Sequence, residues 1–192
     1  MKLLEERILS EGTVLPGNVL KVGSFLNQRI DTRLLREMAR ETARLFAGEG
    51  ITKVITVESS GIAFATAIAM EMDVPVLFAK KHQSSNVDGE VLSCRAHSYT
   101  HNVDYNMVIS REYLSDTDHV LLADDFLASG AALLSLTELV NLAGASLAGA
   151  AICIEKKFQG GGDALREKGV RVESLALIES MDDGTIKFAH SI

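Results

Sequence analysis

The chain has 192 residues, of which 47% are hydrophobic and 23% are charged. This length fits one domain of ordinary size, and this composition excludes an intrinsically disordered chain. The formal net charge of −7 argues against a surface that coats nucleic acid, and it leaves room for a small basic site that binds an anion.

Apolar and amphipathic segments predict the elements of the first half of the chain. Residues 2–9 have the pattern of a short helix, and a second helix starts at Asp31 and Thr32, which are common capping residues. This second helix should stop near Gly48 and Gly50. A buried strand, an apolar helix and another strand follow, at residues 53–59, 61–72 and 74–81.

The pattern breaks at residues 82–106, which are polar and have no strong period. An insert of this length inside a compact domain is often a lid. Beyond the insert, apolar strands and helices alternate to the end of the chain. The expected strands are 107–114, 119–125, 147–156, 170–180 and 185–189, and the expected helices are 130–142 and 162–168.

This alternation predicts the fold class. Continuous apolar strands separated by helices indicate a mainly parallel sheet that is covered on both faces. Right-handed crossovers then give a doubly wound α/β fold, which we expect as a single domain over residues 1–192. Ligands of such folds bind beyond the carboxyl ends of the strands, so candidate site residues should follow the strands directly.

Neither the start of the chain nor its cysteines indicate export. Residues 1–12 carry charged side chains where a secretory leader needs an apolar run. The longest apolar run, residues 62–70, is too short and too rich in alanine to span a bilayer. Cys94 and Cys153 lie far apart and form no disulfide framework. We therefore expect a cytoplasmic protein without membrane contact.

The most informative stretch is VLLADDFLASGAA, residues 120–132, where an apolar strand runs into two carboxylates and then into small residues. Free backbone N–H groups at a helix N-terminus bind phosphate when no side chain blocks the approach. Carboxylates beside such a cradle suit the vicinal hydroxyls of a sugar, or Mg²⁺ on a pyrophosphate. The pattern indicates a phosphorylated sugar, although capping of a turn by Asp124 and Asp125 explains it equally well.

The same stretch resembles the signature of the type I phosphoribosyltransferases, which use 5-phosphoribosyl 1-diphosphate (PRPP). Essentially the whole chain is similar, in matching order, to the members of this family that use xanthine. The matching segments are residues 19–31, 50–63, 119–130, 143–159 and 171–176. The resemblance implies a small N-terminal hood at about residues 1–35 and a flexible lid at about 82–106. It also implies a homodimer that converts xanthine and PRPP to xanthosine 5′-monophosphate and pyrophosphate in purine salvage.

The resemblance implies that the segment after the apolar residues 120–123 binds the sugar half of PRPP. Asp124 and Asp125 would be the catalytic pair, holding the ribose hydroxyls and stabilising an electron-poor transition state. The 5′-phosphate would bind the small residues that follow, which are Ala128, Ser129, Gly130, Ala131 and Ala132. Mg²⁺ would arrive with PRPP, without a direct metal ligand on the protein.

The pyrophosphate half of PRPP is expected at the loop after the strand at 53–59 and under the lid. The residues of this loop are Glu58, Ser59, Ser60 and Gly61. Lys81 would meet pyrophosphate as a mobile charge, and Tyr99 is the aromatic residue of the matching lid segment. The family pattern has lysine where this chain has His101, so a cationic contribution there would depend on pH. Lid closure would keep water away from PRPP.

Xanthine is expected between the hood and the end of the strand at 147–156. The family pattern places Leu20 against the purine face and Asn27 at a base edge. Lys156 would favour a base that is oxo-substituted and readily anionic. From the residues alone, Leu20 is a core residue and Lys156 a solvated strand end.

Other interpretations of the same residues give different functions. A sister transferase for guanine, hypoxanthine or adenine differs only in its base. A PRPP-sensing regulator would carry an added DNA-binding domain, for which a match that starts near residue 1 leaves no room. A Rossmann nucleotide-binding protein lacks support because no G-x-G-x-x-G follows the first strand. Cys94, His97 and His101, with His82 nearby, resemble zinc ligands without a fourth at the proper spacing.

Overall fold

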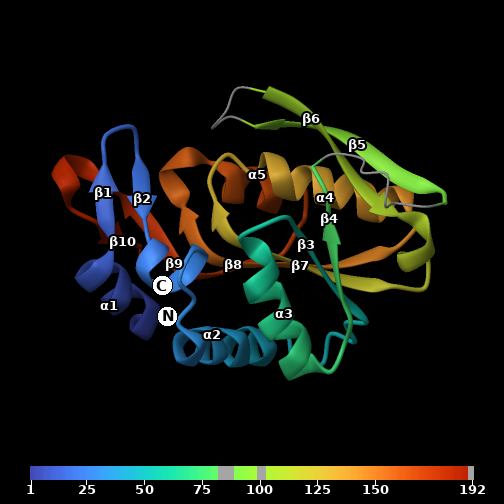
Figure 1. Cartoon of the computed structure of the whole chain (residues 1–192), viewed down its shortest axis with the longest axis horizontal. Coiled ribbons are helices and arrows are strands. Elements are labelled where there is room, and N and C mark those ends of the chain that lie inside the picture. Colours follow the sequence, from blue (N-terminus) through green and yellow to red (C-terminus); the bar gives the residue numbers. More distant parts are fainter. Residues whose placement is uncertain (82–88, 99–102, 190–192) are drawn as a thin grey trace.

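A six-stranded sheet forms the centre of the computed structural model, which describes residues 1–81, 89–98 and 103–189 (Figure 1). The strand order is β10-β9-β8-β7-β3-β4. All neighbouring strands are parallel except β10, which is antiparallel to β9. The bounds are β3 (Lys53–Val57), β4 (Val76–Ala79), β7 (His119–Leu127), β8 (Ser146–Lys156), β9 (Val172–Ser180) and β10 (Lys187–Phe188). The mainly parallel sheet predicted from the sequence is confirmed.

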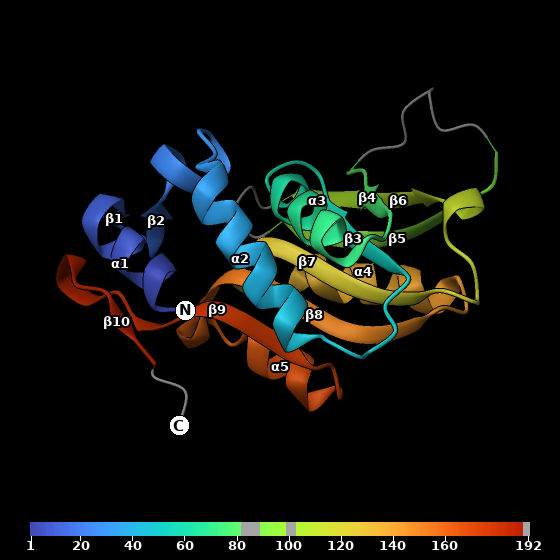
Figure 2. The same cartoon turned by 90° about the horizontal axis from the view of Figure 1, so that it is seen from below.

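Helices cover both faces of this sheet, as a doubly wound fold requires (Figure 2). One face carries α2 (Thr32–Leu45) and α3 (Gly61–Met72), and the other carries α4 (Ala131–Leu142) and α5 (Gly161–Glu167). The buried apolar side chains form two clusters, one on each face. Leu121 belongs to the first cluster and Leu122 to the second, because adjacent strand residues point to opposite faces. No helix in the described part of the chain is long and apolar enough to cross a membrane.

The helices begin within one residue of the predicted positions, and α2 ends at Leu45, three residues before Gly48. Asp31 caps α2, since its Oδ1 accepts hydrogen bonds from the backbone N–H groups of Arg33 and Leu34 at 3.0 and 3.2 Å. The bounds of α3 coincide with those of the apolar run that predicts it. The longer strands also agree to within a few residues.

A small layer formed by the N-terminal residues lies at one end of the sheet (Figure 1). It contains α1 (Lys2–Glu11), the hairpin of β1 (Thr13–Leu15) and β2 (Val19–Lys21), and a helical turn at Gly23–Asn27. Leu4 and Ile8 of α1 are fully buried in the core that also contains residues of β9. The sequence did not predict the hairpin, because three-residue strands are too short to show a period.

Two strands run through much of the polar insert. β5 (Val91–Ser98) and β6 (Val103–Ser110) pair as an antiparallel hairpin. The strand expected at 107–114 therefore starts earlier and ends at Ser110, where a turn follows. Cys94, Met107 and Ile109 are buried in the same cluster as residues of α4, so packing against this helix stabilises strands whose sequence is otherwise polar. The lid itself stays a prediction, since residues 82–88 and 99–102 lie outside the described residues.

Candidate active site

The carboxyl ends of the central strands bring most of the predicted site residues together. Glu58 follows β3, Lys81 follows β4 and Lys156 ends β8. Asp124 and Asp125 lie on β7, between β3 and β8 in the sheet. These strands are parallel, so segments far apart in the sequence meet at one edge of the sheet.

The two aspartates lie inside β7 and not beyond its end. The strand continues to Leu127, two residues further than the sequence predicts, because Phe126 and Leu127 still pair with β8. Asp124 and Asp125 are only 7% and 6% exposed. Their side chains are thus buried acceptors within a strand, which rules out the simpler interpretation that they cap a turn.

Asp125 links three segments of the chain. Its Oδ1 accepts a hydrogen bond from the Ser60 hydroxyl at 2.9 Å, and its Oδ2 accepts one from the Asn27 amide at 3.4 Å. Ser60 belongs to the loop after β3, and Asn27 to the N-terminal layer. The carboxylate therefore holds the predicted pyrophosphate loop and the predicted base-binding segment at one point.

Asp124 carries the strongest electrostatic perturbation of the site. Burial raises the pKa of its carboxyl group well above the ordinary value, and the charge of Asp125 raises it further. The charge of Lys81 opposes this shift. Two adjacent buried carboxylates are best satisfied together by a ligand that donates hydrogen bonds or carries positive charge, such as a sugar diol, a cation or an oxocarbenium-like carbon.

The loop after β7 forms a hollow next to these acids. The hollow has a volume of about 110 Å³ and is lined by Asp124, Phe126 and residues 127–133. Gly130 has a φ of +82°, and α4 starts directly after it. The first N–H groups of α4 have no partner within the helix, and residues 128–132, at its start, carry only small side chains. The five predicted phosphate-binding residues thus form the wall of one small hollow.

The loop after β3 is fixed to the end of β4. The backbone N–H of Glu58 donates to the Ala79 carbonyl at 2.9 Å, and the backbone N–H of Lys81 donates to Glu58 Oε1 at 2.7 Å. A Cβ atom at Gly61 would lie 2.3 Å from Thr56 Oγ1 and 2.7 Å from Asp124 Oδ1. The close approach of α3 to the acid pair therefore requires glycine at this position.

The side chains of the predicted pyrophosphate group differ in exposure. Ser59 and Lys81 are exposed, whereas Glu58 and Ser60 are half-buried. The Lys81 ammonium lies 6.0 Å from the ring centroid of Tyr105, on β6. Burial raises the pKa of the Tyr105 phenol, and the nearby charge of Asp124 adds to the effect. Tyr99 and His101 lie outside the described residues, so their predicted positions are not tested.

The three residues predicted to bind xanthine lie in different surroundings. Leu20 is 6% exposed and belongs to the core. Asn27 is exposed, and its amide is directed to Asp125. Lys156 donates a hydrogen bond to the Asn18 carbonyl at 2.8 Å, and its ammonium lies 5.4 Å from the Phe126 ring centroid. Burial lowers the pKa of Lys156, which is therefore not a solvated strand end.

Sequence reasoning missed Phe126 and Tyr105. Phe126 lies one residue beyond the strand predicted at 119–125, and it packs against the cluster that contains Leu121 and Ala123, which simple alternation along the strand does not predict. Tyr105 carried no signal either, because the strand that holds it was itself not predicted. Both rings now lie beside the charged groups of the site.

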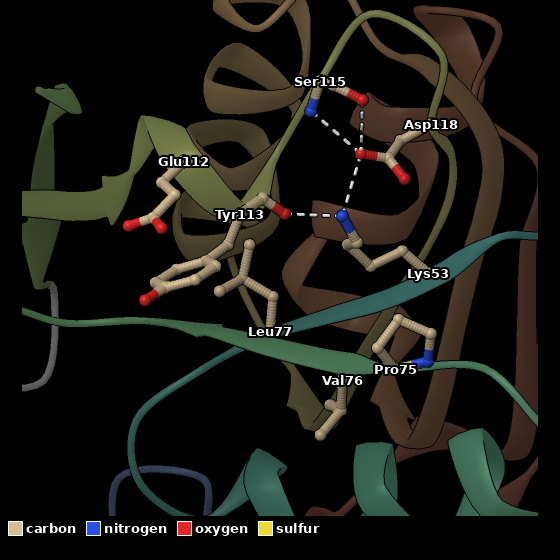
Figure 3. A pocket seen from close by; sticks show the side chains of 8 residues that line it. All are labelled: Lys53, Pro75, Val76, Leu77, Glu112, Tyr113, Ser115 and Asp118. Carbon is tan, nitrogen blue, oxygen red and sulfur yellow. Dashed lines mark hydrogen bonds and ion pairs between the residues drawn. The ribbon is translucent and has the colours of Figure 1, made fainter.

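A second hollow, of about 440 Å³, lies at the opposite end of the sheet (Figure 3). Its lining includes Lys53, Pro75 and Asp118, which stand at the amino ends of β3, β4 and β7. Lys53 donates to Asp118 at 2.8 Å and to the Tyr113 carbonyl, so the charges of Lys53 and Asp118 are already paired with each other. We therefore place the functional site at the carboxyl ends of the strands, where the buried side chain of Asp124 lines the 110 Å³ hollow.

Within the described part of the chain, no group of three or more histidine, cysteine or acidic side chains is arranged to hold a metal ion. Cys94 is buried, and its thiol donates to the Ser135 carbonyl at 3.3 Å. His82 and His101 of the zinc interpretation lie outside the described residues.

Comparisons with known proteins agree with this geometry. Residues 21–182 match the family model described as a phosphoribosyl transferase domain. A xanthine phosphoribosyltransferase of Lachnoclostridium phytofermentans is 49% identical over 190 residues, which are 98% of both chains. Another, of Bifidobacterium adolescentis, is 51% identical over 191 residues, which are 98% of this chain and 99% of that one.

Solved structures match the fold. An adenine phosphoribosyltransferase of Giardia lamblia, complexed with 9-deazaadenine, has a TM-score of 0.77 at 22% identity and covers 90% of this chain and 96% of its own. One from Trypanosoma brucei has a TM-score of 0.75 at 19% identity and covers 90% of this chain and 78% of its own. Together with the near full-length relatives, these matches identify the chain as a member of the phosphoribosyltransferase family and, within it, of the xanthine phosphoribosyltransferases.

Proposed function

We propose that this chain transfers the phosphoribosyl group of PRPP to xanthine, which gives xanthosine 5′-monophosphate and pyrophosphate in purine salvage. The observation that carries the proposal is the identity of 49% and 51% to xanthine phosphoribosyltransferases over nearly the whole chain. A buried acid pair between two strand-to-helix loops suits a substrate with a phosphate at one end and a diphosphate at the other.

The proposed roles follow from the position of each group. Residues 128–132 bind the 5′-phosphate, and Glu58–Gly61 receive the pyrophosphate. As the bond from the anomeric carbon to pyrophosphate breaks, positive charge develops on the ribose ring. Asp124 and Asp125 stabilise this charge, and their burial strengthens the interaction because little water screens it. A ring nitrogen of the purine then attacks the anomeric carbon.

The acid pair fits Mg²⁺ as a companion of PRPP. The phosphate oxygens of PRPP would hold the ion, and the carboxylate of Asp124, which lines the hollow, would attract it without serving as a direct ligand. When bound, the ion neutralises charge on the leaving pyrophosphate. Binding, orientation and stabilisation of the ribose are the work of the chain's own residues.

The base specificity is tested by steady-state kinetics with xanthine, guanine, hypoxanthine and adenine at a fixed PRPP concentration. We expect the highest kcat/KM for xanthine, because Lys156 favours an oxo-substituted, readily anionic base. A higher kcat/KM for another purine would assign the chain to a sister enzyme. Binding of PRPP without turnover of any purine would favour a regulator.

Lys156→Ala should raise the KM for xanthine by roughly tenfold or more and leave the KM for PRPP nearly unchanged. A charge-assisted hydrogen bond contributes about 1.5–3 kcal/mol, and the ammonium has donors left after its bond to Asn18. Lys157→Ala is the matched control, since Lys157 is the exposed neighbour. A larger effect on PRPP than on xanthine would contradict the assignment.

The resemblance to the family also leads us to propose a homodimer located in the cytoplasm. Size-exclusion chromatography with light scattering on the purified chain, at several concentrations, tests the oligomeric state. A monomer at all of these concentrations would count against the proposed dimer.

A further inference from the structure

A fully buried charge lies behind the proposed phosphate site and takes no part in the roles given above. Glu155, on β8, is 0% exposed. Its Oε1 and Oε2 accept hydrogen bonds from Nη1 and Nη2 of Arg166, on α5, both at 2.8 Å. The Ser174 hydroxyl, on β9, also donates to Oε2. All available partners of this carboxylate thus come from two neighbouring elements.

Stability alone does not explain such a pair. A buried ion pair contributes little net stability compared with apolar residues of similar volume, because both charges lose their hydration. What the bidentate geometry does provide is a fixed distance and a fixed orientation between the two groups. Here it fixes α5, a seven-residue helix that is too short to be stable without tertiary contacts, to the end of β8.

The first residue of α5 rests directly on the backbone of the predicted phosphate loop. The N–H of Gly161 donates to the Ala128 carbonyl at 3.1 Å. A Cβ atom at Gly161 would lie 2.3 Å from this carbonyl oxygen and 2.4 Å from the backbone nitrogen of Gly130. No side chain therefore separates the start of α5 from the loop.

The next residue of α5 touches the ion pair. A Cβ atom at Gly162 would lie 1.8 Å from Glu155 Oε1 and 2.6 Å from Arg166 Nη1. Gly162 therefore lies against the ion pair, and Gly161 lies against the predicted phosphate loop. Only the backbone of these two glycines separates the ion pair from the loop. A shift of α5 relative to β8 has to move the backbone at residues 128–130.

We propose that Glu155 and Arg166 are positioning residues for the 5′-phosphate of the sugar substrate. By holding α5 against β8, the pair sets the place of the loop at residues 128–130 and so aligns its N–H groups with the phosphate. The inference rests on the proposed function, since it assumes that this loop binds a phosphorylated ribose. It differs from a purely structural role because it predicts an effect on one end of PRPP only.

The test replaces the guanidinium fork by a single ammonium, in Arg166→Lys. Calorimetry should show about tenfold weaker binding of ribose 5-phosphate and binding of pyrophosphate within about twofold of the wild type. In steady-state kinetics, the KM for PRPP should rise about tenfold while the KM for xanthine stays unchanged. Arg171→Lys is the matched control: Arg171 also pairs with two carboxylates and is similarly exposed, at 38% against 36%, but its partners are Glu49, Glu173 and the Leu45 carbonyl and not Glu155. It should change none of these values.

Equal effects of Arg166→Lys on ribose 5-phosphate and pyrophosphate, or no effect on either, would overturn the inference. If Arg166→Lys fails to fold, Ser174→Ala decides, because it removes one hydrogen bond and keeps the ion pair. A selective loss of about threefold in ribose 5-phosphate affinity supports the proposal, and an unchanged affinity overturns it. A wild-type protein that binds neither PRPP nor ribose 5-phosphate would refute the proposed function itself. Failure of the proposed function is thus distinguished from failure of the positioning role, which is seen only in the variants.

Discussion

The double variant Asp124→Asn/Asp125→Asn should lower turnover by roughly a thousandfold or more while the fold survives. Removal of one preorganised stabilising group typically costs about 10²- to 10³-fold in kcat, and this variant removes both charges that are proposed to face the ribose. Single-turnover measurements with saturating PRPP and xanthine would report the loss, and circular dichroism would report the fold. Rates close to those of the wild type in a folded double variant would refute the catalytic role of the pair.

The single variant Asp124→Asn should be more stable than the wild type when no ligand is bound. The pKa of Asp124 is raised in the folded protein, chiefly by burial and then by the charge of Asp125. A carboxyl group with a raised pKa destabilises the fold as the pH rises from the ordinary pKa through the raised one, because the folded state then has to lose a proton that it binds more tightly. The side chain of Asp124→Asn carries no charge at any pH and still offers an oxygen to the backbone N–H of residue 125.

Melting temperatures of the wild type and of Asp124→Asn over a pH series from 4 to 8 would measure this destabilisation. We expect the gain in Tm of Asp124→Asn to be on the order of 5 °C at neutral pH and to shrink toward acid pH, where the wild type is protonated. Asp116→Asn serves as the control, since Asp116 is exposed. A gain that is the same at every pH, or a loss of Tm at neutral pH, would contradict the assigned shift.

Much of the fold was predictable because local patterns determine it. The bounds of α3 follow from one apolar run, and Asp31 caps α2 as its sequence position indicates. The pairing of acids and small residues at 124–132 marked the proposed phosphate loop before its shape was known. In each case the interactions that determine the structure join residues within one or two helical turns or within one strand.

The contacts that assemble the site were not predictable in this way. Asp125 is hydrogen-bonded to residues 98 and 65 positions away, Asn27 and Ser60. These contacts exist because β7 lies between β3 and β8, and a sequence pattern does not specify strand order. Gly161 gave no signal either, since its purpose is a backbone contact with a loop more than 30 residues earlier. The sequence shows that a residue is glycine, but only the structure shows which group lies too close for a side chain.

Gly61→Ala should reduce the free energy of unfolding by about 2 kcal/mol and turnover by at least about a hundredfold. The added methyl group would meet Thr56 Oγ1 at 2.3 Å and Asp124 Oδ1 at 2.7 Å, and both residues are buried. Alanine in a helix is otherwise up to about 1 kcal/mol better than glycine, so a loss of stability isolates the clash. Gly23→Ala is the control, because its nearest neighbours are the Gln28 side chain at 3.6 Å or more. Chemical denaturation and steady-state kinetics measure the two effects.

The double variant Thr56→Ala/Gly61→Ala distinguishes a packing defect from a displaced acid. Thr56 Oγ1 is buried and has no hydrogen-bond partner among the described residues, so its removal costs little and relieves the shorter of the two contacts. Stability should therefore recover in the double variant. Turnover should stay low, because the alanine methyl still lies against the Asp124 carboxylate and moves it relative to the ribose. Recovery of both quantities would mean that Asp124 tolerates this displacement, and the close approach of α3 would then serve packing alone.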